Sequence, residues 1–362
     1  MPDAAVDAVI AVHDPRRRVG RAVSSVLRDA PDGVRVTVVC HNTPVDGIAA
    51  ALRRDGADPD DARITLRELH DDVPSPAGPF NLGIEAATAQ FVSVMGSDDT
   101  LEPGAIRSWL SSAARPGVRA VIPRLRHANG VYVATPVVRP LRAARLDLVR
   151  DRLSYRSAPL GLVAASAVRR LGLRMTEGVA VGEDVAFVTR LWSSGERLAF
   201  DRGGPAYVIG DDAEERVTYT RRPVATELEF VRRLVQEGWF ASLPPARRRA
   251  VVTKLVRIHV FGAVLHRPEA AWWTATERES LRDVTALALA VAPRAAAPLA
   301  VADRRLLDAV LDPSVPAARL VALAVARRRF GMPSTLVPRD LSQVLAREAP
   351  VRFSAASLLL RR

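Results

Sequence analysis

Short apolar runs that end in polar loops alternate with helical patterns through the first hundred residues. The run over 7–12 ends at His13-Asp14-Pro15, a helical pattern covers 19–29, and a valine-rich run over 34–40 ends at His41-Asn42. A helical pattern over 48–54 and further apolar runs over 64–69 and 91–95 continue the series. Strands alternating with helices predict an α/β fold with a largely parallel sheet. Ligands bind at the carboxyl ends of strands in such sheets, so the loops after Val12, Cys40 and Met95 are the first candidates.

The second part of the chain has a different character. Residues 223–362 show mainly helical periodicity interrupted by proline clusters, so we predict an α/β domain over 1–222 and a basic helical domain over 223–362. The net charge is +12, and residues 245–362 hold 20 Arg or Lys against 9 Asp or Glu. Only one of the 52 basic residues is a lysine, Lys254, which indicates a compositional bias toward Arg. That bias does not explain why the excess lies at one end, which predicts an anionic partner there.

Cysteine content and hydropathy indicate the compartment. The chain has one cysteine, Cys40, so no disulfide within the chain is expected, and a reducing environment is favoured. The first residues lack the pattern of a signal peptide, and the longest apolar stretches are broken before the roughly 20 residues of a spanning helix. We therefore expect a cytoplasmic protein, with peripheral contact to the inner membrane face as an extension of that expectation.

Two adjacent carboxylates follow the strand at 91–95. Asp98 and Asp99 offer the hard oxygen ligands that Mg²⁺ or Mn²⁺ prefers. A metal at a strand end can bind a diphosphate and neutralise the charge on a leaving group. The alternative is a turn whose aspartates cap the next helix, where Thr100 is well placed as a cap and Pro103 lies early.

Six short segments in order resemble the family 2 glycosyltransferases of the GT-A fold. They are a strand with its polar end, a Ser-Val-Leu helix segment, a second strand end, a Gly/Asn/Gly segment, an Asp pair after a strand, and a later Glu-Asp pair. Here these are residues 9–14, 25–27, 38–42, 78–83, 97–99 and 183–184. The resemblance covers about residues 7–220. It implies a GT-A fold, a Rossmann-like mixed sheet flanked by helices, that binds a nucleotide diphosphate sugar.

The resemblance also implies roles for individual residues. Asp99 would bind Mn²⁺ or Mg²⁺ bridging the diphosphate, with Asp98 beside it contacting the ribose or the donor sugar. Asp184 would be the catalytic base, and Glu183 would orient it or bind the acceptor. An acidic pair at a helix N-terminus is also favoured by the helix dipole alone, which is the alternative for Glu183 and Asp184.

Further positions match the lining of the nucleotide pocket. These are Ala11 near the end of the first strand, His13 and Asp14 after it, and Asn42 after the second. Asn81, between Gly78 and Gly83, fits a loop whose backbone approaches the ligand, and a plain helix start is the alternative for each glycine taken alone. Arg216 lies in a segment where similar enzymes place a group over the diphosphate, although solvent exposure is the commoner fate of an arginine in such an Arg-rich chain.

Two positions depart from the family pattern. The second strand ends in Cys40-His41-Asn42, where the family usually has an aspartate that contacts the base, and Gly96 stands where the first acidic residue of the Asp cluster is common. The first departure leaves the identity of the nucleotide open. The second removes one carboxylate but leaves Asp98 and Asp99.

Together these features predict an inverting, metal-dependent transfer of a sugar to a cell-surface glycan or an anionic wall-polymer acceptor. The basic domain would hold a phosphodiester polymer, a lipid-linked phosphate or the inner membrane surface, or would form a homo-oligomer. Nucleic acid is not expected, because aromatic residues make up 5% and no nucleic-acid-binding motif occurs. The rivals are a catalytically degenerate glycosyltransferase-like scaffold and a sugar nucleotidyltransferase, which would usually have a glycine-rich loop after the first strand.

Overall fold

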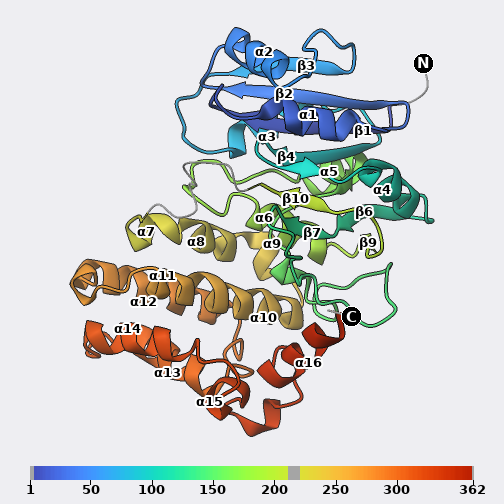
Figure 1. Ribbon diagram of the computed structural model, residues 1–362. Helices are drawn as coiled ribbons and strands as arrows, with labels where there is room; N and C mark the ends of the chain where they lie inside the picture. The colour runs from blue at the N-terminus through green and yellow to red at the C-terminus, as the bar shows by residue number, and fades with distance from the viewer. Residues whose placement is uncertain (1–3, 211–220, 361–362) are drawn as a thin grey trace.

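The computed structural model describes residues 4–210 and 221–360 and contains an α/β part followed by a helical part (Figure 1). The strands are β1 (Val6–Val12), β2 (Val34–His41), β3 (Ile64–Leu69), β4 (Phe91–Gly96), β5 (Thr100–Leu101), β6 (Val118–Pro123), β7 (Leu125–His127), β8 (Leu162–Ala164), β9 (Arg197–Asp201) and β10 (Tyr207–Ile209). The main sheet has the order β3-β2-β1-β4-β8-β6-β9, and a small sheet has the order β5-β10-β7. Strands β1 to β4 run parallel, and β8 is antiparallel to both neighbours, so the sheet is mixed as expected.

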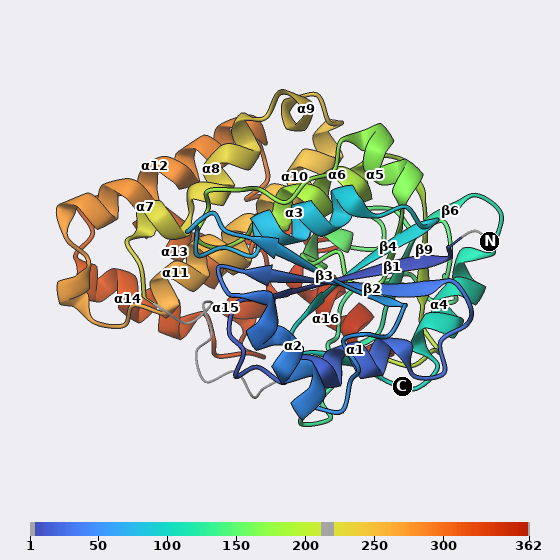
Figure 2. The ribbon, with the colours of Figure 1, turned by 90° about the horizontal axis from the view of Figure 1, so that it is seen from above.

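Helices cover both faces of the sheet. In the α/β part they are α1 (Val19–Leu27), α2 (Val45–Arg54), α3 (Ala77–Ala86), α4 (Ala105–Ala113), α5 (Ala165–Leu171) and α6 (Val185–Ser193). Side chains alternate along β1: Ala8 and Ile10 pack in one cluster with α1, α2 and α4, while Val9 packs in another with α3 and α6. Figure 2, seen from above, shows α1 and α2 on one side of the strands and α3 on the other.

The helical part continues the second of these clusters. Its α-helices are α7 (Val224–Glu227), α8 (Glu229–Gln236), α9 (Gly238–Ala241), α10 (Pro245–Lys254), α11 (Phe261–Leu265), α12 (Ala275–Val291), α13 (Val301–Leu311), α14 (Ala317–Ala326), α15 (Pro333–Leu336) and α16 (Pro350–Leu360). A π-helical turn, η3 (Leu255–Val260), joins α10 to α11, and short 3₁₀ turns are η1 (Leu153–Tyr155), η4 (Ala270–Trp272) and η5 (Leu341–Gln343). One cluster of buried apolar side chains runs without interruption from Val9 and Val94 of the sheet to Leu255 and Leu307 of these helices.

The strand register brings the polar strand ends together. Ala11 of β1 pairs with Gly96 of β4, Val12 pairs with Cys40 of β2, and His41 pairs with Leu69 of β3. The carboxyl ends of four strands therefore share one edge of the sheet, as the sequence predicted.

Two local expectations were wrong. Residues 78–83 form part of helix α3 rather than a loop, and a side chain at Gly83 would put its Cβ 2.2 Å from Val9 Cγ1, so glycine allows the helix to lie against β1. The helix expected to start at Thr100 begins at Ala105, because Thr100 and Leu101 pair as β5 with Val208 and Tyr207.

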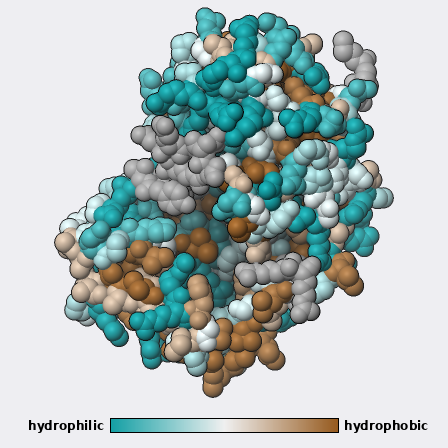
Figure 3. Space-filling model, viewed as in Figure 1, coloured by the Kyte–Doolittle hydropathy of each residue, from teal (hydrophilic) through white to brown (hydrophobic). Residues whose placement is uncertain are grey.

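The surface of the helical part has an apolar region. In Figure 3, hydrophobic side chains gather over the segment between α14 and α16. Within residues 4–210 and 221–360, no helix has the length and apolar character that crossing a bilayer would require.

Candidate active site

A cavity of about 580 Å³ lies at the shared edge of β1, β2 and β4. Its walls come from the loops after these strands, from the N-terminal turn of α3, and from the end of β10. The lining residues are Ala11, Val12, His13, Arg17, His41, Asn42, Pro74, Ser75, Pro76, Pro79, Phe80, Gly96, Ser97, Asp98, Asp99, Ile209 and Gly210. Of the predicted site residues, Ala11, His13, Asn42, Asp98 and Asp99 therefore meet in one cavity.

Asp99 is held from the small sheet. The Tyr207 hydroxyl donates to Asp99 Oδ2, and the Gly210 amide donates to Asp99 Oδ1 at 2.8 Å. Burial raises the pKa of Asp99 above its ordinary value, and the two hydrogen bonds oppose that shift. The pKa of Tyr207 is raised by burial and by Asp99, so the phenol stays protonated and remains the donor. A carboxylate held in this way is pre-oriented toward the cavity.

The second carboxylate lies close to the first. Oδ2 of Asp98 is 3.4 Å from Nη1 of Arg17, and Arg21 donates to the Asp98 carbonyl at 3.1 Å. A Cβ placed on Gly96 would lie 2.7 Å from Asp99 Oδ2 and 3.1 Å from Asp98 Oδ1. Both carboxylates therefore crowd around Gly96, which accounts for glycine at a position where the resemblance led us to look for an acid.

A hydrogen-bonded group of four residues borders another side of the cavity. His41 Nε2 lies 2.7 Å from Asp71 Oδ1, and the Asn42 side-chain oxygen accepts from the amides of Asp71 and Asp72 at 3.0 and 3.1 Å. Burial would raise the pKa of Asp71, but hydrogen bonds from the Val73 amide and from His41 hold it below the ordinary value. Asn42 adopts a left-handed backbone (φ 52°), which asparagine tolerates better than most residues. The side chain of Asn42 thus fastens the loop after β3 to the end of β2.

His13 and Asp14 take different positions after β1. His13 lines the cavity, where burial and Arg17 lower its pKa and so favour the neutral ring. Asp14 does not line it. Its carboxylate accepts from the backbone amide of Arg16 at 2.9 Å and from the Arg16 side chain at 2.8 Å, and this pairing lowers the pKa of Asp14 to about 2. Asp14 therefore lies in a turn at the surface and not in the nucleotide pocket, where we expected it.

Asn81 is buried and does not line the cavity either. Its side chain accepts from the Met175 amide at 2.8 Å and donates to the Met175 carbonyl at 3.1 Å. The Thr176 amide in turn donates to the Glu183 carbonyl at 2.8 Å. Instead of facing a ligand, as expected, Asn81 joins α3, which forms a cavity wall, to the segment that carries Glu183 and Asp184.

The Glu183-Asp184 pair begins α6 and lies outside the described cavity. Asp184 is the N-cap residue, yet its side chain makes no capping hydrogen bond. Burial, together with the neighbouring Glu183 carboxyl, raises the pKa of Asp184 to about 8, and the positive charge of Lys254 opposes the rise. Burial also raises the pKa of Glu183. A carboxyl group with a pKa near neutrality suits proton transfer at physiological pH.

Arg216 lies outside the described residues.

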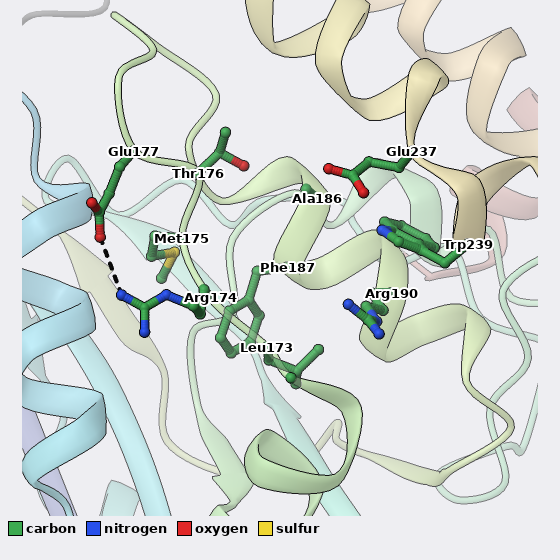
Figure 4. Close-up of a pocket in the computed structure, with 11 residues that line it drawn as sticks. Leu173, Arg174, Met175, Thr176, Glu177, Ala186, Phe187, Arg190, Glu237 and Trp239 are labelled. Carbon is green, nitrogen blue, oxygen red and sulfur yellow. Dashed lines mark hydrogen bonds and ion pairs between the residues drawn. The ribbon is translucent and has the colours of Figure 1, made fainter.

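A second cavity, of about 350 Å³, lies beside α6 (Figure 4). Arg174 pairs with Glu177 at 3.3 Å on one side, and the Arg190 guanidinium lies 5.6 Å from the Trp239 ring centre on the other. Glu237 points into the same cavity in this view. This cavity joins the α/β part to α9 of the helical part.

Several contributors to these sites were not identified from the sequence. Arg17, Asp71, Tyr207 and Lys254 carry no local motif, and the first three reach their partners from distant segments. Of these four residues, only Lys254 stood out in the sequence, because it is the single lysine among 52 basic residues.

Comparisons with known proteins agree with this arrangement. Residues 7–172 match the family model described as glycosyl transferase family 2. The succinoglycan biosynthesis protein ExoO of Rhizobium meliloti (strain 1021) is 26% identical over 268 residues, which are 69% of this chain and 74% of ExoO. The crystal structure of S. aureus TarS 1–349 in complex with UDP-GlcNAc superposes with a TM-score of 0.73 at 14% identity, covering 90% of this chain and 91% of that one. TarS 1–349 without that ligand gives a TM-score of 0.70 at 13% identity and the same coverage.

The likeness to TarS extends over both parts of the chain and establishes the fold, while the sequence match covers the strand ends that form the first cavity. Residues 7–172 are accordingly similar to the family 2 glycosyltransferases, and the chain has the GT-A fold.

Proposed function

We propose that the protein transfers a sugar from a nucleoside diphosphate sugar, with inversion at the anomeric carbon, to a glycan or anionic polymer of the cell surface. The observation that carries this proposal is the pair of carboxylates, Asp98 and Asp99, at the wall of a strand-end cavity. The S. aureus TarS structure was solved with UDP-GlcNAc, which supports a nucleotide sugar as the ligand of this cavity.

Different walls of the cavity suit different parts of a nucleotide-sugar donor. A volume of about 580 Å³ is in the usual range for small-molecule sites. Pro74, Pro79 and Phe80 provide an apolar wall suited to a base, while His41 and Asn42 supply polar edges. Arg17 Nη1 lies 3.4 Å from Asp98 Oδ2 and lines the cavity, where its guanidinium could pair with a diphosphate oxygen. We therefore assign the nucleoside to the His41 side and the diphosphate to the Asp98 side.

The carboxylates fit a divalent cation. Mg²⁺ and Mn²⁺ sites often use one or two carboxylates, with substrate phosphates and water completing the shell. Among the described residues no group of three or more His, Cys, Asp or Glu side chains could hold a metal alone, so diphosphate oxygens would have to contribute. Asp99, with Asp98 beside it, would hold the ion, which would neutralise charge on the departing diphosphate.

Inversion requires a single displacement. The acceptor oxygen forms a bond to the anomeric carbon while the bond to the diphosphate oxygen breaks, and the acceptor hydroxyl proton must go to a base. We assign this base to Asp184, because burial raises its pKa to about 8 and no capping bond occupies its side chain. Glu183 lies beside it and is proposed to orient the acceptor. The Asn81 bridge would keep both residues in register with the donor cavity.

The acceptor is proposed to be a surface polysaccharide or its lipid-linked precursor. The curated relative is a succinoglycan biosynthesis protein, and the basic residues concentrated after Pro245 suit an anionic polymer. The cavity in Figure 4, with Arg174, Arg190 and Trp239, lies one turn of α6 from Asp184 and is our candidate for a distal acceptor subsite.

We also propose a peripheral contact with the inner face of the membrane, and hence a cytoplasmic location. Phe330, Met332, Leu341, Leu345 and Leu358 are exposed near exposed arginines. Apolar side chains flanked by arginine favour an anionic lipid surface. Sedimentation with phosphatidylglycerol vesicles, but not with phosphatidylcholine vesicles, is expected. A change of oligomeric state in Leu341→Ser/Leu345→Ser without any vesicle binding would assign this region to a homo-oligomer contact instead.

The donor assignment is tested by calorimetric titration of the protein with UDP, GDP, TDP and CDP, each with and without Mn²⁺. We expect one nucleotide to bind in a Mn²⁺-dependent manner and Asp99→Ala to lose that dependence. The product of transfer to a glycan acceptor should have the opposite anomeric configuration to the donor, as read by NMR. Well-folded protein that binds none of the four nucleotides would favour the degenerate scaffold.

A further inference from the structure

Two neighbouring cavities in the helical part are lined mainly by arginine and alanine. Their volumes are about 340 and 360 Å³, and Arg294 and Ala297 line both, so the two cavities adjoin and form one elongated groove. None of their lining residues lines the strand-end cavity or the cavity in Figure 4. We call this feature the arginine groove, and its arginines are Arg249, Arg294, Arg304, Arg339 and Arg347.

Local structure explains why these arginines border open space. In α10, Ala246, Arg249, Ala250 and Thr253 are spaced three and four residues apart and so share one face of the helix, which lines the groove. The short alanine side chains on that face leave room beside the longer guanidinium group. Arg294, in the turn after α12, has a left-handed backbone (φ 68°), a conformation that non-glycine residues rarely adopt. Such backbone outliers cluster at functional sites, and this one is independent of the charge of the groove.

Three of the five guanidinium groups lack an acidic partner. Within the part of the chain that the structure describes, the side chains of Arg249, Arg294 and Arg347 form no ion pair. Arg249 and Arg347 are nonetheless partly buried, and arginines removed from water are normally paired. Burial, together with the positive charge of Arg352, lowers the pKa of Arg347, whose Nη1 donates to the neutral carbonyl oxygen of Arg150 at 2.8 Å. The groove therefore holds positive charge that the described fold does not neutralise.

The acidic residue at this end of the groove is engaged elsewhere. The Glu348 side chain is buried, and its Oε2 accepts from the Tyr155 hydroxyl at 3.0 Å and lies 3.5 Å from Arg257 Nη1. The backbone carbonyl oxygen of Glu348 accepts from Arg257 as well, at 2.7 Å. The charge of Glu348 is thus balanced by Arg257 and not by the arginines of the groove.

At the other end of the groove the charges are partly balanced. Asp308 lies 2.6 Å from Arg339 Nη1 and 3.6 Å from Arg304 Nη2. Asp340 also lines this end, and its Oδ1 accepts from the Ser342 hydroxyl at 2.6 Å. The unbalanced charge is therefore concentrated in the cavity beside α10, and the second cavity extends the groove from there.

The lining chemistry favours one kind of partner. Among the described residues, no aromatic side chain lines either cavity, so the groove has no platform on which the bases of a nucleic acid would stack. Guanidinium groups bind phosphate and carboxylate groups with paired hydrogen bonds. Because the groove is elongated and arginines line both of its cavities, it suits a chain with repeated anionic groups better than a single anion or one lipid headgroup.

We propose that the arginine groove binds a linear polyanionic stretch of the acceptor, away from the end that receives the sugar. The inference rests on the proposed function, because it locates the acceptor polymer named there. The groove adjoins the α/β part, since Val149 lines it, and its wall α10 contacts the end of α6, where Arg247 Nη1 donates to the Ser193 carbonyl oxygen at 2.7 Å. A chain held at this second place has a higher local concentration at the site of transfer, although the groove touches no reacting atom.

The test measures the binding of fluorescein-labelled linear polyphosphate by fluorescence anisotropy, in metal-free buffer at several NaCl concentrations. Arg249→Gln and Arg294→Asn each remove one charge, and asparagine tolerates a left-handed backbone. Neither arginine side chain forms a hydrogen bond or an ion pair among the described residues, so both variants should keep the wild-type thermal midpoint. We expect each to weaken binding about five- to tenfold and to reduce the slope of log Kd against log [NaCl] by about one. Arg319→Gln, which removes an exposed charge of α14 outside the groove, is the control and should change Kd by less than about twofold.

Weakening that is confined to the two groove variants supports the proposal. Equal weakening in Arg319→Gln overturns it, because binding would then depend on diffuse charge, and so does a wild type that binds orthophosphate as tightly as polyphosphate. A wild type that does not bind polyphosphate also overturns it, and loss of binding to phosphatidylglycerol vesicles in the same variants would then assign the groove to a lipid headgroup.

The proposed function is judged separately, by calorimetry with nucleotides and Mn²⁺. Both groove variants should bind nucleotide as the wild type does, because the groove shares no residue with the strand-end cavity. A protein that binds polyphosphate through the groove but binds no nucleotide would contradict the transferase assignment and leave the groove as a polyanion site.

Discussion

Gly96→Ala is expected to disturb the carboxylate cluster without adding charge. The new Cβ would stand 2.7 Å from Asp99 Oδ2, closer than such atoms approach, and Asp99 is not free to move aside because Tyr207 and Gly210 hold it. Relief requires loss of at least one hydrogen bond to a charged group, which corresponds to about 2 kcal/mol. We expect the free energy of unfolding to fall by about that amount and Mn²⁺-dependent nucleotide binding to weaken.

The matched control is Gly203→Ala, since an added Cβ there meets nothing within 4 Å. Urea denaturation gives the stability of both variants, and calorimetry gives their nucleotide affinity. If Gly96→Ala matches Gly203→Ala in both measurements, then the two carboxylates do not pack around Gly96, and the argument for a pre-oriented Asp99 fails.

Three further predictions concern other parts of the site. Asn81→Ala should lower the free energy of unfolding by about 1–3 kcal/mol, because it leaves the Met175 amide and carbonyl unpaired in the interior; calorimetry should show that donor binding changes less than turnover does. Asp184→Asn should raise the thermal midpoint at pH 9 and raise it much less at pH 5, because a carboxyl whose folded pKa of about 8 exceeds its unfolded value makes the folded state progressively less stable as pH rises from the unfolded pKa to the folded one; calorimetric melts at the two pH values test this, and equal midpoints at pH 9 would contradict it. His41→Ala should weaken nucleotide binding at neutral pH. Because the pKa of Asp71 is depressed, the contact between His41 and Asp71 should stabilise the folded protein above the unfolded pKa of Asp71, and this stabilisation should be lost as pH falls through the folded pKa. The free energy of unfolding of the wild type and of the variant, measured from pH 7 to pH 3, should therefore converge.

The first four strands, β1 to β4, were predictable from the sequence because each is a compact apolar run with a polar end. The run at 64–69 has the observed bounds of β3, and 34–40 falls one residue short of β2. The error at α3 has a clear cause: Gly78, Pro79 and Gly83 usually indicate a loop, whereas here Gly83 permits contact with Val9. The error at Thr100 arose because pairing with β10, more than a hundred residues away, overrides a local capping pattern.

The site was predictable in part for the same reason. Asp98, Asn42 and His13 follow neighbouring parallel strands of one sheet, so their meeting follows from topology alone. Tyr207 and Asp71 could not be placed, since the first depends on a small second sheet and the second on how a loop folds back over Asn42. Asp14 and Asn81 match the motif by position, but their side chains are committed to Arg16 and Met175, which a motif does not reveal.

The unbroken apolar cluster between sheet and helices limits how such a protein can be divided or recombined. Cutting the chain near Pro223 would expose the sheet-side residues Phe187 and Leu191 together with the helix-side residues Phe230 and Leu255. Neither fragment is then expected to be soluble alone, and a helical part taken from a relative would have to bring a matching apolar face. Changes of acceptor during the divergence of such enzymes would therefore proceed more readily by substitution on the outer helices, α13 to α16, than by exchange of the whole helical part.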